Sequence, residues 1–164
     1  MSIKGGPYHE IFYVDNVDLI DEGPKFIEWN EEDYVEIHDD ILSRFHDYFM
    51  WIETYNPVGP KEFNRGFNYE GLTAIRDENL VKFGELIDSL LNLFKNAPDD
   101  IILTGGFCWG TPPDIEVPIG YNLNNGYYEK IKIEKDELLK IFGDLKKITA
   151  RAVESNGYLL HFGL

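Results

Sequence analysis

The chain has 164 residues, of which 43% are hydrophobic and 15% aromatic. This is enough apolar material to form one core, and it excludes a disordered chain. The net charge of −15 would repel nucleic acid and anionic membranes, and the one cysteine, Cys108, excludes an intramolecular disulfide. We therefore expect a single domain spanning residues 1–164. With no secretory signal at the start of the chain, we expect it to be cytoplasmic.

The amino-terminal part of the chain predicts two strands followed by one long helix. Apolar residues mark strands at Tyr8–Val14 and Lys25–Trp29. The helix is expected over Glu31–Tyr55, with Asn30 as its N-cap and acidic residues close to the positive end of the helix dipole. Its apolar residues recur at steps of three and four: Tyr34, Ile37, Ile41, Phe45, Tyr48 and Ile52.

The remainder of the chain predicts two further helices and four strands. The helices are expected over Glu78–Asn96 and Asp136–Ser155. The strands are expected over Phe67–Ile75, Ile101–Trp109, Tyr127–Ile133 and Tyr158–Phe162. The continuous apolar run at the start of the second of these is typical of a central strand. The order ββαβαββαβ predicts an α+β fold with one mixed, mostly antiparallel sheet and three packed helices.

Charge is concentrated in the first third of the chain. Residues 1–55 hold 14 acidic and 3 basic side chains, a net of −11, whereas residues 56–164 hold 16 and 12, a net of −4. On the predicted first helix, six carboxylates fall within about 120° of one another. They are Glu32, Asp33, Glu36, Asp39, Asp40 and Asp47.

This acidic helix face has two interpretations. It is either a solvated surface or a docking surface for a basic protein partner, whose association it would steer electrostatically. Like charges at i,i+4 destabilise a helix by about 0.2–0.5 kcal/mol each, and lysines that would relieve them are absent from these positions. The docking interpretation requires the carboxylates to share one face and to lack matching cations.

Motifs for catalysis or cofactor binding are weak. Gly105-Gly106 is not followed by the Lys-Ser/Thr pair of a phosphate-binding loop. His38 and His46 would lie about 80° apart on a helix, so we predict no metal site and no cofactor. An alternative function remains open, namely a hydrolase-like enzyme using Cys108 with a histidine and a carboxylate. A third is a self-associating scaffold, which the many aromatic residues suggest.

Three features together resemble the small immunity proteins that bacteria make beside polymorphic toxins. They are the acidic first helix, the run Gly66–Thr73 leading into a capped helix, and the closing residues His161–Leu164. The resemblance implies a non-catalytic inhibitor, or antitoxin, whose acidic surface covers a basic toxin domain, often a nuclease. It carries no specific residue roles.

Overall fold

The computed structural model describes residues 6–15, 30–58, 63–111 and 126–164. It is an α+β fold with three helices and antiparallel sheets, as predicted. The helices are α2 (Asp39–Phe49), α3 (Glu78–Phe94) and α4 (Lys135–Ser155), with a short 3-10 turn η2 (Glu31–Asp33). The strands are β1 (Tyr8–Val14), β2 (Tyr34–His38), β3 (Glu53–Tyr55), β4 (Phe63–Arg65), β5 (Leu72–Arg76), β6 (Asp100–Trp109), β7 (Gly126–Glu134) and β8 (Tyr158–Phe162).

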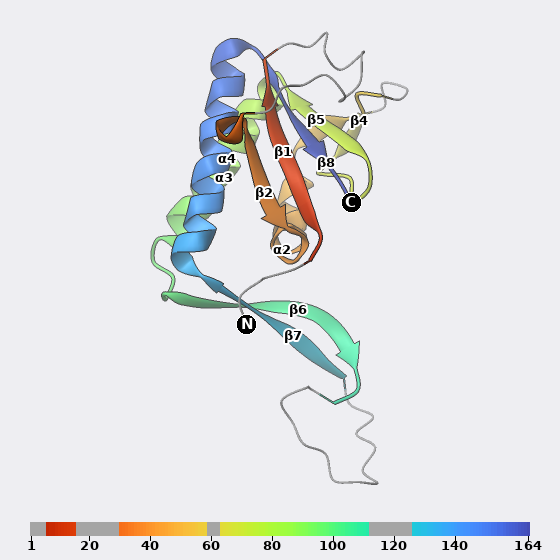
Figure 1. Ribbon diagram of the computed structural model, residues 1–164, viewed down its shortest axis with the longest axis vertical. Coiled ribbons are helices and arrows are strands. Elements are labelled where there is room, and N and C mark those ends of the chain that lie inside the picture. Colours follow the sequence, from red (N-terminus) through yellow and green to blue (C-terminus); the bar gives the residue numbers. More distant parts are fainter. Residues whose placement is uncertain (1–5, 16–29, 59–62, 112–125) are drawn as a thin grey trace.

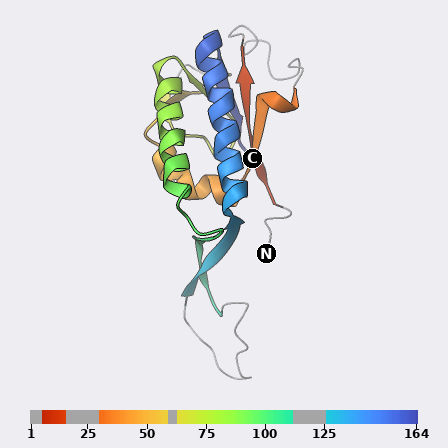
Figure 2. The same cartoon turned by 90° about the vertical axis from the view of Figure 1, so that its left-hand side faces the viewer.

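Six strands form the main sheet, in the order β2-β1-β8-β5-β3-β4, with every neighbouring pair antiparallel. Strands from the two ends of the chain, β1 and β8, therefore lie side by side as its second and third strands (Figure 1). Helices α2, α3 and α4 all lie on one side of this sheet (Figure 2). We call that side the helix-covered face and the opposite side the outer face.

Because successive side chains of a strand point to opposite faces of the sheet, the buried apolar residues form two separate clusters. Ile11, Ile75 and Leu159 point to the helix-covered face, where they join the main core with residues such as Phe83. Their neighbours Phe12, Ala74 and Leu160 form a smaller cluster on the outer face. Both sides of the central strands are thus apolar, and the larger cluster lies between sheet and helices.

The predicted helix over Glu31–Tyr55 is wrong at both ends. Residues 31–33 form η2, residues 34–38 form the edge strand β2, and α2 covers only Asp39–Phe49 before β3 begins. The run Tyr34-Val35-Glu36-Ile37-His38 satisfies both periodicities, because its apolar residues suit a helical stripe and also alternate as in a strand. Pairing with β1 over five residues decides in favour of the strand, which suits its β-branched Val35 and Ile37.

The other two helices are confirmed, with α3 and α4 lying within two residues of their predicted bounds. The predicted strand over Phe67–Ile75 is shorter, since β5 begins at Leu72, and the short strands β3 and β4 were not predicted. The predicted strand Lys25–Trp29 lies outside the described residues.

The prediction of one sheet with Ile101–Leu103 in a central strand is also wrong. Strands β6 and β7 pair only with each other and form a hairpin that extends away from the body (Figure 1). The base of the hairpin explains the apolar run, because Ile101 and Ile133 lie opposite each other and both are buried in the main core. An Arg44 Nη1 hydrogen bond of 2.7 Å to the carbonyl oxygen of Thr104 ties this base to α2.

Candidate protein-binding surface

The six carboxylates expected on one helix face are distributed over three elements. Glu32 and Asp33 belong to η2, and Glu36 lies on β2. The remaining three, Asp39, Asp40 and Asp47, are on α2. The predicted acidic helix face therefore does not exist, because its first three members precede the helix. The condition for docking through this face, a shared helix surface, is therefore not met. Binding of a partner by any single one of the six residues stays a prediction.

Asp33 is matched by a cation from a distant part of the chain. Its carboxylate pairs with Arg151 of α4, and its side chain is only 16% exposed. The pair lies beside a groove of about 690 Å³ between the β2 edge and α4. Within that groove Asp144 pairs with Lys140 at 2.8 Å and with Lys147 at 2.7 Å, and both lysines lower the pKa of the Asp144 carboxyl against the effect of its burial. Asp33 and Asp144 are thus both neutralised by cations of α4.

Asp39 belongs to a buried histidine network. Its Oδ1 lies 3.1 Å from Nε2 of His9, and its Oδ2 accepts a 3.3 Å hydrogen bond from the hydroxyl of Tyr69. His9 Nδ1 in turn lies 3.0 Å from Nε2 of His161. Both histidines are almost completely buried on the helix-covered face, so the network links β1, β8 and the first turn of α2.

The partners of each atom assign the protons in this network. His9 donates from Nε2–H to Asp39, which leaves its Nδ1 to accept from Nε2–H of His161. His161 Nδ1 has no hydrogen-bond partner within the described part of the chain, and a bare lone pair there costs less than a buried N–H. Burial, reinforced by the neighbouring His9, lowers the pKa of His161 to about 3. His161 is therefore neutral near pH 7, and its role in the network is structural.

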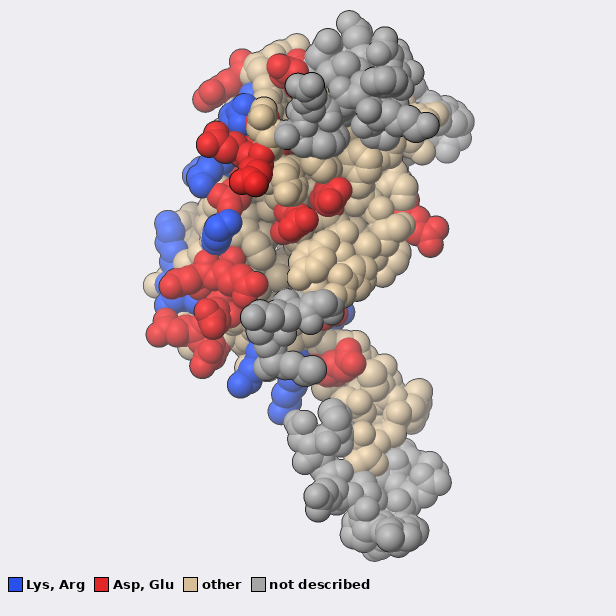
Figure 3. All heavy atoms as spheres, in the orientation of Figure 1, with Lys and Arg blue, Asp and Glu red and all other residues tan. Residues whose placement is uncertain are grey.

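The outer face carries a different acidic feature. Glu10 of β1 and Glu36 of β2 are directly opposite in the antiparallel register, so their side chains extend to the same side. Glu36 is exposed and Glu10 half-buried, and neither forms an ion pair with another described residue. Figure 3 shows carboxylates standing alone in the uncharged surface over the strands, whereas acidic and basic groups intermingle over the helices.

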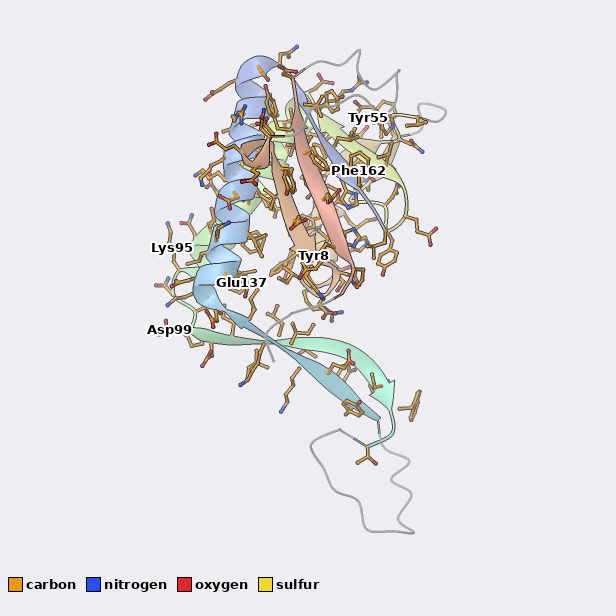
Figure 4. All side chains as sticks on the ribbon, in the orientation of Figure 1. Tyr8, Tyr55, Lys95, Asp99, Glu137 and Phe162 are labelled. Carbon is orange, nitrogen blue, oxygen red and sulfur yellow. The ribbon has the colours of Figure 1, made fainter. Side chains whose placement is uncertain are left out.

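Aromatic rings border this glutamate pair, which we call the Glu10–Glu36 site. Tyr8 and His38, the next outward-facing pair on one side, meet edge to face with ring centroids 5.1 Å apart. Phe12 and Tyr34, the next pair on the other side, stack at 5.3 Å. Phe162 lies opposite Glu10 on β8, and Figure 4 shows it on the same side of the sheet as Tyr8. Sequence reasoning missed this site because it depends on the pairing of two strands.

The geometry gives little support to the alternative in which Cys108 is a nucleophile. Cys108 lies on β6 of the hairpin opposite Tyr127, whereas the four histidines lie on β1, β2, α2 and β8 of the body. Over the described ranges, no group of three or more His, Cys, Asp or Glu side chains is arranged to hold a metal ion. Among the helices in those ranges, none combines the length and apolar character needed to cross a membrane.

Comparisons with known proteins assign no function to the Glu10–Glu36 site. No family model matches the chain, and neither the curated proteins nor the solved structures include a match.

Proposed function

We propose that the protein is a non-catalytic inhibitor of the immunity or antitoxin type, and that it binds a basic protein domain through the Glu10–Glu36 site. The observation that carries this proposal is a pair of carboxylates set directly opposite each other on adjacent strands without a cation from the described residues. Because the predicted acidic helix face does not exist, the expected contact is the glutamate pair on the sheet.

A like-charged pair at opposite strand positions destabilises a sheet, by roughly the 0.2–1 kcal/mol that an opposite-charge pair would contribute. Some acids of the chain are neutralised internally, as Asp144 is by Lys140 and Lys147. At Glu10 and Glu36 no such neutralisation is found among the described residues. A cation contributed by a partner would relieve the repulsion, so the pair favours the bound state over the free one.

The surroundings favour arginine as the cationic group. A guanidinium can donate hydrogen bonds to two carboxylates in a fixed geometry and can also stack on aromatic rings, whereas an ammonium acts as a point charge. The rings of Tyr8 and Tyr34 flank the glutamates, and cation–π contacts with such rings contribute about 0.5–2 kcal/mol. We therefore expect an arginine from a basic toxin domain, such as a nuclease, to lie between the two carboxylates.

Isothermal titration calorimetry with the purified basic product of the neighbouring gene tests the proposal. The variant Glu10→Gln/Glu36→Gln keeps the size of both side chains and removes their charge. Truncating one side of a desolvated charge pair costs about 2–5 kcal/mol, so we expect Kd to rise at least about thirtyfold.

The matched control is Glu85→Gln/Glu137→Gln, which removes two charges from exposed positions on α3 and α4. This variant has the same net charge as the test variant, and its Kd should stay close to that of the wild type. Equal weakening in both variants would indicate that only overall charge matters, and it would rule out the Glu10–Glu36 site. Failure of the wild-type protein to bind would contradict the inhibitor proposal itself.

A further inference from the structure

The β6–β7 hairpin carries an exposed apolar surface that the proposed function does not use. Side chains on alternate residues of the hairpin face either the body or solvent. Ile101 and Ile133 face the body, so Ile102 and its opposite residue Lys132 face away from it. Beyond a bulge at Gly105–Gly106 the solvent-facing positions are Phe107, Tyr128 and Trp109. We call this side of the hairpin the aromatic face.

The rings of the aromatic face form one contiguous cluster. Phe107 meets Trp109 edge to face at 5.1 Å and Tyr128 at 5.3 Å. Trp109 is 80% exposed and Tyr128 61% exposed. Exposed clusters of this kind usually mark interaction surfaces. In addition, an isolated two-stranded hairpin is only marginally stable by itself, so a partner that covers it would stabilise it.

The aromatic face also carries two lysines, and the exposed Asp100–Glu134 pair at its base extends to the same side. Lys130 and Lys132 are exposed and extend to the same side as the rings. Neither lysine forms an ion pair with any residue that the structure describes. The complementary surface is the Glu10–Glu36 site, where two carboxylates that form no ion pair with a described residue lie among aromatic rings.

We infer that the aromatic face of the hairpin docks on the Glu10–Glu36 site of a second copy of the chain. Lys130 and Lys132 would pair with the two glutamates, and the Trp109 ring would pack against the rings that border them. Two copies can exchange these contacts reciprocally, which closes the assembly as a two-fold dimer and stops further growth. The net charge of −15 on each copy opposes association at long range, so we expect a dimer that dissociates on dilution.

Sedimentation velocity on the protein alone, over a range of concentrations, tests this inference without any foreign partner. A failure here is thus distinguishable from a failure of the inhibitor proposal. Wild-type protein should show a concentration-dependent monomer–dimer equilibrium. Trp109→Ala should weaken the dimer at least about tenfold, since buried tryptophans dominate interface energies. Trp51→Ala, which alters a tryptophan that is 66% exposed on the body, should leave the equilibrium unchanged.

Charge reversal identifies the surface on which the hairpin docks. Lys130→Glu/Lys132→Glu and Glu10→Lys/Glu36→Lys should each be monomeric alone, because each variant places like charges on both contact surfaces. Mixed together, they should form a heterodimer, in which both reciprocal contacts again join opposite charges.

Three results would overturn the inference. The first is wild-type protein that stays monomeric at every concentration. The second is a dimer that forms in the wild type and also forms in each of the two charge-reversed variants alone. The third is a mixture of the two reversed variants that stays monomeric although each is folded by circular dichroism, because this would show that the hairpin meets some other surface.

Discussion

His9 and Glu10 are neighbours in β1, yet their side chains lie on opposite faces of the sheet and have opposite electrostatic environments. On the helix-covered face, His9 is buried and hydrogen-bonded on both ring nitrogens. On the outer face, Glu10 lies opposite another glutamate, and no ion pair satisfies it within the described residues. The two faces of one strand therefore differ: His9 is hydrogen-bonded within the fold, and Glu10 has no ion pair among the described residues.

From this difference we expect residues on the helix-covered face to determine stability and residues of the Glu10–Glu36 site to determine binding. Substitutions on the helix-covered face should change the free energy of unfolding, because each group there has partners within the fold. Substitutions at the Glu10–Glu36 site should change binding and leave the fold intact. The following predictions test this division, starting with the largest effect.

Phe83→Ala should cause the largest loss of stability. Phe83 of α3 is fully buried and packs against the rings of Phe49 and Phe67. Replacing a buried phenylalanine with alanine leaves a cavity and costs about 3–5 kcal/mol, which urea denaturation followed by circular dichroism would measure. Phe63→Ala, at a position that is 73% exposed on β4, is the control and should shift the free energy of unfolding by less than about 0.5 kcal/mol.

The histidine network should make stability fall as the pH is lowered. The pKa of His161 is lowered to about 3 in the folded protein, whereas an unfolded histidine titrates near pH 6.5. Between these values the unfolded chain binds a proton that the folded protein does not, so acid favours unfolding. Relative to pH 7.5, the contribution of this residue should reduce the free energy of unfolding by roughly 2 kcal/mol at pH 5.0, above the range where most carboxylates titrate.

His161→Gln is the variant that tests this assignment, because glutamine is polar and does not titrate. The variant should be less stable at neutral pH, since Nδ1 of His9 then loses its present donor. Its free energy of unfolding should nevertheless depend less steeply on pH between 7.5 and 5.0 than that of the wild type. An unchanged slope would show that His161 is not the group that takes up the proton on unfolding.

The sequence predicted the helices that depend on local signals and failed where tertiary pairing decides. For α3 and α4 the apolar stripe is long, and no strand-like alternation competes with it. For residues 34–38 a helical stripe and a strand alternation coexist, and only the pairing of Glu36 with Glu10 and of its neighbours with the rest of β1 resolves the choice. Ile101–Leu103 lies in a strand as predicted, but not in the main sheet, because the buried base of a hairpin can be as apolar as a central strand.

The candidate site was predictable in its chemistry but not in its location. Acidic residues in the first third of the chain suggested a cationic partner, and Glu36 belongs to both the predicted acidic helix face and the proposed Glu10–Glu36 site. Its actual partner, Glu10, is 26 residues away, and their proximity follows only from the register of β1 with β2. Asp33 could not be recognised as neutralised, because Arg151 reaches it from the opposite end of the chain.

Removing charge from the Glu10–Glu36 site should produce the smallest change in stability, and one of opposite sign to the others. Glu10→Gln/Glu36→Gln eliminates a like-charged pair at opposite strand positions, so the free energy of unfolding should rise by a few tenths to about 1 kcal/mol. Urea denaturation at pH 7.5 would measure this change, and added salt should reduce it by screening the repulsion in the wild type. If this variant is more stable than the wild type but binds the partner more weakly, the two glutamates contribute to binding at the expense of stability. Loss of stability in this variant would instead place the two glutamates among the residues that hold the fold together.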